Sequence, residues 1–159
     1  MTILDASEIS VDELGAADRT PLHRAAGANH VECCKTLISF GADLNKRDKT
    51  GRTPLHWAAL QGNTAVVECL VENGADIFAI NDKSYTSLHN SAEEGKDETV
   101  KLLLTKVEQE SERHRLCNIE NRNKKKAADL AKEGGYKTVL KALREGGDPN
   151  VKSGGCCIS

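Results

Sequence analysis

The sequence predicts an all-α solenoid of stacked helix-turn-helix units joined by short hairpin loops, and three observations support this fold class. The segment DRTPLHRAA at 18–26 recurs as GRTPLHWAA at 51–59 and, less strictly, as SYTSLHNSA at 84–92, a spacing of 33 residues. A second motif, FGADLN at 40–45, returns as NGADIF at 73–78. Aromatic residues make up only 3% of the chain. A helical stack tolerates so few aromatic residues better than one closed core does.

The first helix of each unit has a clear start signal. Thr20 and Thr53 are suitable N-caps, and a proline follows each at the first helical position, where its missing N–H costs nothing. His23 and His56 then stand at the third helical position, close enough to hydrogen-bond back toward the cap. Because these histidines recur with the repeat, we interpret them as capping residues rather than catalytic groups or metal ligands.

The second helix of each unit carries an apolar stripe. Four positions of the first unit align with four of the second, namely Cys33, Cys34, Leu37 and Ile38 with Val66, Val67, Leu70 and Val71. This spacing gives one apolar face at helical period. The cysteines therefore read as small buried hydrophobic residues. Gly41 and Gly74 follow these helices, where a left-handed residue is expected.

With both motifs at this period, the chain resembles the ankyrin-repeat family from about Asp18 to Asn150. The resemblance implies repeats at about 18–50, 51–83, 84–120 and 121–150, the last being a divergent terminal repeat. Residues 1–17 contain a short amphipathic pattern, which we expect to form an N-terminal capping helix. The third repeat is seven residues too long. We expect this insertion, near 107–116, to lengthen the second helix of that repeat, either as a solvent-facing extension or as a partner contact.

The resemblance also implies a protein partner, bound through hairpin tips and exposed first-helix positions on the concave face of a monomer. Carried onto this sequence, those positions are Arg47, Lys49, Thr50, Arg52, Leu60, Gln61, Ile80, Asp82, Lys83, Tyr85, Asn90, Glu93 and Glu94. Tyr85 is the expected anchor, being aromatic at a variable position, whereas Trp57 is expected to pack between helices. Asn45 resembles hairpin asparagines that are hydroxylated in this family; the alternative is a simple turn hydrogen bond.

The final residues predict a lipid anchor. Residues 151–159 lose the helical pattern and read as a flexible tail that ends in Cys156, Cys157, Ile158 and Ser159, a C-a-a-X ending. Prenylation of Cys156 by a prenyltransferase would follow, with farnesyl favoured by the final serine and geranylgeranyl left open by the double cysteine. One isoprenoid gives marginal attachment, so the basic last repeat, with eight basic and two acidic residues over 122–144, is a candidate second contact with the cytosolic face of a membrane.

Other functions are disfavoured. The sequence has no phosphate-binding glycine loop, nucleophile motif or CxxC pair, so we expect no enzyme activity, no cofactor and no metal site. The net charge of −2 and the lack of aromatics among the lysines argue against nucleic-acid binding. We find no secretion signal, myristoylation glycine or spanning stretch. The expected protein is a membrane-tethered scaffold in the cytoplasm; the alternative is a soluble cytosolic or nuclear regulator whose ending stays unmodified.

Overall fold

The computed structural model describes residues 10–147 and shows stacked antiparallel helix pairs in that range. The helices are α1 (Pro21–Gly27), α2 (Val31–Ser39), α3 (Pro54–Gln61), α4 (Thr64–Glu72), α5 (Ser87–Glu93), α6 (Asp97–Lys106), α7 (Glu110–Asn118), α8 (Ala127–Glu133) and α9 (Lys137–Glu145), preceded by the short 3-10 helix η1 (Ala16–Asp18). The all-α solenoid predicted from the sequence is confirmed.

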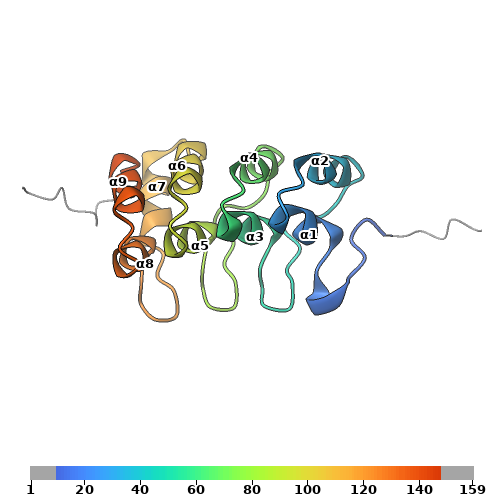
Figure 1. The fold of residues 1–159 in the computed structure, drawn as a ribbon, viewed down its shortest axis with the longest axis horizontal. Coiled ribbons are helices and arrows are strands. Elements are labelled where there is room, and N and C mark those ends of the chain that lie inside the picture. The colour runs from blue at the N-terminus through green and yellow to red at the C-terminus, as the bar shows by residue number, and fades with distance from the viewer. Residues whose placement is uncertain (1–9, 148–159) are drawn as a thin grey trace, which may run out of the picture.

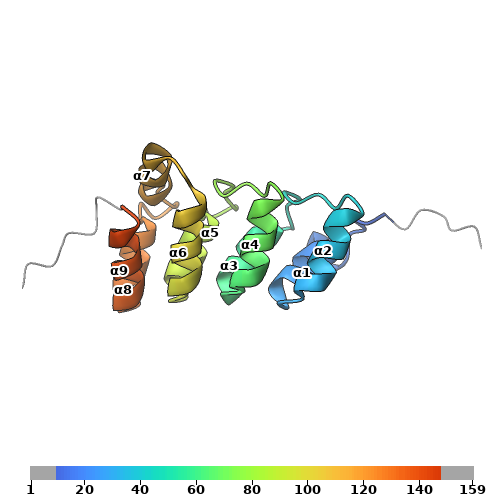
Figure 2. The same cartoon turned by 90° about the horizontal axis from the view of Figure 1, so that it is seen from above.

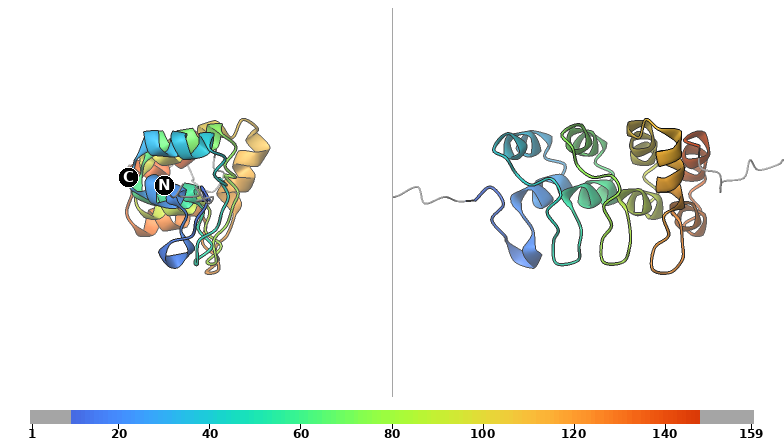
Figure 3. Two further views of the ribbon diagram at one scale, coloured as in Figure 1. Left: turned by 90° about the vertical axis from the view of Figure 1, so that its right-hand side faces the viewer. Right: turned by 180° about the vertical axis from the view of Figure 1, so that it is seen from behind.

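The helices form two rows. One row contains α1, α3, α5 and α8, and the other contains α2, α4, α6 and α9, with loops projecting beyond the first row (Figure 1). Each helix of the first row packs on the next helix of that row and on its own partner in the second row. Seen from above, α7 stands apart from both rows (Figure 2). The end-on view in Figure 3 places the loops to one side of the helices, so loops and first-row helices meet at an angle.

Short side chains allow this close packing. Ala26, Ala58, Ala59 and Ala92 on the first-row helices have no exposed surface, and neither do the larger core residues Leu22, Val66, Val67, Leu70, Leu88, Val100 and Leu103. Full burial of a Leu or Val side chain contributes about 1.5–3 kcal/mol. The core therefore runs the length of the stack as a continuous layer between the two rows.

The capping motifs form as predicted. In α1 the Thr20 amide donates to His23 Nδ1 over 3.1 Å, and the same bond joins Thr53 to His56. The third repeat keeps this box at Thr86 although serine replaces the proline. In the last repeat Asp129 takes the histidine's place, its Oδ2 accepting from the amide of the N-cap residue over 2.9 Å. The first helix of each of the four pairs is thus capped by the residue at its third position.

The insertion does not lengthen α6, and that prediction is wrong. Helix α6 ends at Lys106, Val107 adopts an extended backbone, and α7 begins at Glu110. Turning the chain here buries Val107, Leu116 and Cys117, which are at most 7% exposed and which a straight helix would carry away from the core. Burial of these apolar side chains outweighs the helix-favouring composition of the segment.

The described part of the expected capping helix is not helical either. Ser10–Leu14 contains a turn, and residues 1–9 lie outside the described part of the chain. Instead, the chain before α1 has the same backbone hydrogen bond as a hairpin of the later repeats. The Gly15 amide donates to the Arg19 carbonyl over 2.9 Å, and the Asp48 amide donates to the Arg52 carbonyl over 2.8 Å. Val11 packs against the core, and the Asp12 carboxylate accepts from the Asp43 amide over 3.1 Å. In residues 10–14, pairing with the first hairpin therefore takes the place of a helix.

The four cysteines within residues 10–147 follow the prediction with one exception. Cys34, Cys69 and Cys117 are buried, but Cys33 is exposed, so its expected burial is wrong. Val66 occupies the equivalent position on α4 and is fully buried. Helix α4 lies between α2 and α6, whereas α2 has only α4 beside it in its row among the described residues. The exposure of Cys33 is thus an effect of its place at the end of the stack.

Candidate protein-binding face

Three hairpin tips are built on one polar anchor each. The anchors are Asp48, Asn81 and Asn121, which are at most 6% exposed. The Oδ1 atom of each accepts backbone hydrogen bonds from the residues two and four positions later, over 2.8 to 3.1 Å. These bonds close each tip as an Asx-type turn, so the intervening side chains are held outward on a fixed backbone.

The tips are also joined to one another. The Lys49 amide donates to the Ala17 carbonyl over 2.9 Å, Asp82 to Thr50 over 3.1 Å and Arg122 to Lys83 over 3.1 Å. The result is a ridge of tips linked through their backbones, parallel to the first row of helices (Figure 1). We call the surface formed by this ridge and the exposed side of α1, α3, α5 and α8 the inner face.

In the first two repeats, buried histidines connect α1 and α3 to the next hairpin. His23 Nε2 lies 2.9 Å from the Arg52 carbonyl and His56 Nε2 lies 2.8 Å from that of Tyr85. Because Nδ1 accepts from the threonine amide, the network assigns the neutral tautomer with the proton on Nε2, which donates to the carbonyl. Burial lowers the pKa of His56 to about 4, although the bond to Tyr85 opposes that change. The histidines therefore act as neutral structural bridges.

The bridge is missing in the third repeat. His89 caps α5 as expected, but its buried Nε2 has no hydrogen-bond partner in the described structure. Burial lowers the pKa of His89 as well, so the ring stays neutral. The backbone of Lys125, at the position equivalent to Arg52 and Tyr85, still opposes this lowering of the His89 pKa.

The residues predicted to bind a partner are spread over the inner face and its edges. Those with exposed side chains in the structure are Arg47, Lys49, Thr50, Gln61, Ile80, Asp82, Lys83, Glu93 and Glu94. Arg52, Leu60 and Tyr85 are half-buried. Asn90 is only 2% exposed, so its selection as an exposed contact position is wrong. The equivalent residue on α3 is Trp57. The larger indole of Trp57 remains half-exposed, whereas the smaller Asn90 side chain is buried.

Two of the candidates are partly engaged within the chain. Arg47 Nη2 lies 3.3 Å from Asp82 Oδ1 on the next tip, and more than half of each side chain is exposed. The Tyr85 hydroxyl donates to Glu93 Oε1 over 3.2 Å, and its ring lies 5.4 Å from that of His89. Burial raises the pKa of Tyr85. Tyr85, which precedes α5, is thus held against that helix, with part of its surface exposed.

Sequence reasoning missed the role of Trp57. Its ring packs beside Gly27 of α1, in agreement with the expected packing between helices, but it also remains half-exposed on the inner face. The guanidinium groups of Arg19 and Arg52 lie 4.2 and 5.1 Å from the ring centre. The sequence does contain a signal for this group of Trp57, Arg19 and Arg52. The residue before the N-cap is an arginine in both of the first two repeats, Arg19 and Arg52.

Asn45 has a defined structural role. Its Oδ1 accepts from the Asp76 amide of the next hairpin over 2.9 Å, and its own amide donates to Asp43 Oδ1 over 2.9 Å. The turn hydrogen bond considered from the sequence is therefore present, extended by a bond to the neighbouring repeat.

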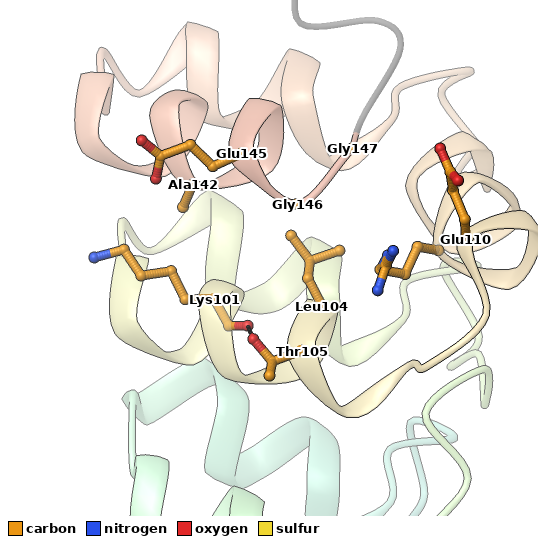
Figure 4. Close-up of a pocket in the computed structure, with 9 residues that line it drawn as sticks. Lys101, Leu104, Thr105, Glu110, Ala142, Glu145, Gly146 and Gly147 are labelled. Carbon is orange, nitrogen blue, oxygen red and sulfur yellow. Dashed lines mark hydrogen bonds between the residues drawn. The ribbon is translucent and has the colours of Figure 1, made fainter.

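A hollow of about 650 Å³ lies between α6, α7 and α9 (Figure 4). Its lining consists of Lys101, Leu104, Thr105, Glu110, Arg113, Ala142, Glu145, Gly146 and Gly147. The charged groups already have neighbours: Lys101 pairs with Glu98 over 2.8 Å and Arg113 donates to the Val107 carbonyl over 3.1 Å. In residues 10–147, no three His, Cys, Asp or Glu side chains are grouped to hold a metal ion. The inner face is therefore the stronger candidate site.

Comparisons with known proteins agree with this geometry. Residues 3–81 match a family model described as ankyrin repeats in three copies. A segment of 46 residues, 29% of this chain, is 35% identical to ankyrin repeat domain-containing protein 13B of Mus musculus and of Homo sapiens, covering 7% of those proteins. Another match of 46 residues is 39% identical to protein phosphatase 1 regulatory subunit 27 of Mus musculus and covers 30% of it. The matched segments thus span less than a third of these relatives.

The chain is an ankyrin-repeat protein, and ankyrin repeats bind proteins. None of the helices within residues 10–147 has the length and apolar character needed to cross a membrane. The proposed lipidation site, Cys156, and the three residues after it lie outside the described part of the chain.

Proposed function

We propose that this protein is a non-catalytic scaffold or adaptor that binds a partner protein on its inner face. The observation that carries the proposal is the ridge of hairpin tips, whose backbones are fixed by anchors and by bonds between tips while their side chains point outward. Such preorganisation lowers the entropy lost on binding. One relative is by name a regulatory subunit of protein phosphatase 1, which supports a protein as the partner. The contacts that we propose are the exposed and half-buried residues predicted above.

Site-specific photo-cross-linking tests this proposal. A photoreactive phenylalanine analogue at Lys49 on the first tip or at Gln61 at the end of α3 should capture the same partner from a cell extract, identified by mass spectrometry. The matched control carries the analogue at Ala65, which is exposed on α4 in the other row of helices. Capture at Ala65 alone, or at none of the three positions, would contradict a partner on the inner face.

We propose a lipid tether as the second part of the function. In this hypothesis Cys156 is prenylated, the last three residues are removed, and the scaffold is held at the cytosolic face of a membrane. The support is the sequence ending and the basic last repeat, in which Lys132, Lys137 and Arg144 are exposed. Lys125 is partly neutralised, because its Nζ lies 2.7 Å from Glu133. The residues 151–159 would then be the tail of a chain whose repeats occupy 18–150.

The tail hypothesis has a direct test. Protein produced in a eukaryotic cytosol should gain one isoprenoid mass, lose the mass of three residues and enter the detergent phase on partition. Cys156→Ser should abolish all three changes, whereas the neighbouring Cys157→Ser should retain them because a C-a-a-X ending remains. An unmodified mass that stays in the aqueous phase would favour the alternative, a soluble cytosolic or nuclear regulator.

A further inference from the structure

The inner face of the first two repeats carries a basic cluster around one indole. Trp57 lies against Arg19 at 4.2 Å and Arg52 at 5.1 Å, and its Nε1 donates to Asp48 Oδ2 over 3.0 Å. The ring lies beside Gly27 of α1, where an added Cβ would be in ordinary van der Waals contact with it at 3.8 Å. The indole is thus held by one hydrogen bond and flanked by two guanidinium groups, while part of its surface stays exposed.

The one buried carboxylate in this cluster is already saturated. Asp48 Oδ1 accepts from the Thr50 amide, the Thr50 hydroxyl and the Arg52 amide, over 2.8 to 3.0 Å, and Oδ2 accepts from the indole. Burial by itself would raise the pKa of Asp48, but the hydrogen bonds from Trp57, Thr50 and Arg52 lower it, so the group stays ionised. Arg19 is its only ion-pair partner among the described residues, at 3.8 Å.

Several cations of the cluster have no such partner. Among residues 10–147, no carboxylate lies within 4.0 Å of the charged nitrogens of Arg24, Lys49 or Arg52. The Arg52 Nε is buried and has no hydrogen-bond partner there. Arg24 is exposed on α1. It lines a hollow of about 410 Å³ together with Arg19, Pro21 and residues 13–15. Positive charge therefore remains uncompensated beside an exposed aromatic surface.

Acidic groups mark the limits of the cluster. Glu13 also lines this hollow, and the exposed Asp18 lies in η1. On the other side, the exposed Glu93 and Glu94 are at the end of α5, beyond α3. The later tips also expose basic side chains, at Lys83, Arg122 and Lys124, but within the described residues arginines flank an indole only at Trp57. A ligand with negative charge and an apolar side chain would be attracted to this cluster and repelled by Glu93 and Glu94 at the end of α5.

We infer that this basic cluster, consisting of Arg19, Arg24, Lys49, Arg52 and Trp57, binds an acidic segment of a partner protein. The inference rests on the proposed scaffold function and specifies its ligand. Guanidinium groups bind carboxylates through paired hydrogen bonds, so Arg24 and Arg52 recognise Asp or Glu side chains of the segment. An apolar side chain beside those carboxylates covers the outward surface of Trp57, which supplies the buried aromatic centre of the contact.

Trp57 is the sole tryptophan of the chain, so its fluorescence reports on this site directly. The probe is a capped peptide of about ten residues with alternating Glu and Leu, about 33 Å when extended. It should change the fluorescence of Trp57 on titration, and its affinity should fall as salt is added. A peptide with Lys in place of Glu should not bind.

Neutralising the arginines gives the decisive comparison. Arg24→Gln should weaken binding of the acidic peptide about threefold, and Arg24→Gln with Arg52→Gln about tenfold. The control Arg122→Gln removes an exposed arginine from the third tip and should leave the affinity unchanged. Circular dichroism melting curves confirm that each variant is folded. Because Arg24 has no ion-pair partner to lose, the single variant remains informative even if the Arg52 variant unfolds.

Four results would overturn the inference. Three of them are absence of binding by the acidic peptide, equal binding of the lysine peptide, and equal loss of affinity in Arg122→Gln. A fourth is tighter binding of a single-stranded oligothymidylate than of the acidic peptide, which would identify the cluster as a phosphate-binding surface. Cross-linking from Lys49 and Gln61 is independent of these outcomes. A partner captured there without acidic-peptide binding would retain the scaffold function and reject only the acidic ligand.

Discussion

Lowering the pH from 7 to 5 should destabilise the fold through its buried capping histidines. In the folded protein burial lowers the pKa of His56 to about 4, whereas in the unfolded chain an imidazole has a pKa of about 6.5. Between these two values the unfolded state binds more protons than the folded state. The free energy of unfolding therefore falls as the pH decreases from 6.5 toward 4, and stability is fully present above that range.

The magnitude follows from the two pKa values. His56 alone should remove about 2 kcal/mol between pH 7 and pH 5, and about 3 kcal/mol by pH 4. His23 and His89, whose pKa values are also lowered by burial, act in the same direction. The lowered pKa of Asp48 contributes only when the pH approaches the ordinary carboxyl range near 3.8, below this window. The histidines should therefore dominate the change between pH 7 and 5.

Urea denaturation followed by circular dichroism at pH 7, 6 and 5 measures this effect. The informative variant is His56→Gln, because glutamine at the third helical position retains the capping hydrogen bond but does not titrate. Its loss of stability from pH 7 to 5 should be about 2 kcal/mol smaller than that of the native chain. His30→Gln, at an exposed position before α2, is the control and should behave like the native chain. Equal losses for the native chain and His56→Gln would refute the reasoning.

Two further predictions concern the glycines and the cysteines. Gly41 and Gly51 both have left-handed backbones, with φ of 83° and 74°. Gly41→Ala should lower the free energy of unfolding by about 1 kcal/mol through backbone strain alone. Gly51→Ala should lower it more, because its Cβ would also lie 2.9 Å from the Asp82 amide nitrogen. Thermal melts in which Gly41→Ala is the less stable variant would contradict this. Iodoacetamide should modify the exposed Cys33 well before the buried Cys34, whose pKa burial raises to about 11. Peptide mapping distinguishes the two sites, and equal labelling of both would show that α2 opens readily.

Much of the fold could be predicted from local signals. The Thr-Pro-Leu-His starts gave the beginnings of α1 and α3 because capping depends on residues three positions apart. The prediction for α5 also held, although Ser87 replaces proline, since the bond from the Thr86 amide to His89 Nδ1 does not require proline. The register of the repeat also extends to α8, because Asp129 caps that helix as the histidine caps the others.

The inserted segment shows where local signals fail. The composition of 107–116 favours a helix and has no breaking residue, so the sequence pointed to an extension of α6. The break at Val107 exists because this side chain and Leu116 are buried against the stack. Only the positions of neighbouring repeats decide whether such side chains can reach the core. Arg113 then stabilises the break by donating to the Val107 carbonyl.

The candidate site was predicted in part for a similar reason. Tip positions such as Lys49 and Lys83 are exposed as expected, because they lie between anchor residues that the sequence reveals. Burial on the first-row helices depends on the neighbouring helix and on side-chain size. Asn90 is therefore covered, while Trp57 at the equivalent position projects onto the inner face.

The repeat, the helix starts, the left-handed glycines and hence the class of fold could be read from local sequence patterns, since each depends on contacts within a few residues. Packing between repeats sets which equivalent positions are exposed, how the insertion folds, and that arginines from two repeats meet around Trp57. These features arise from contacts between repeats about 30 residues apart, such as His23 with the Arg52 carbonyl, whose sequence separation is 29. A pattern within one repeat does not record which side chains of the next repeat lie against it.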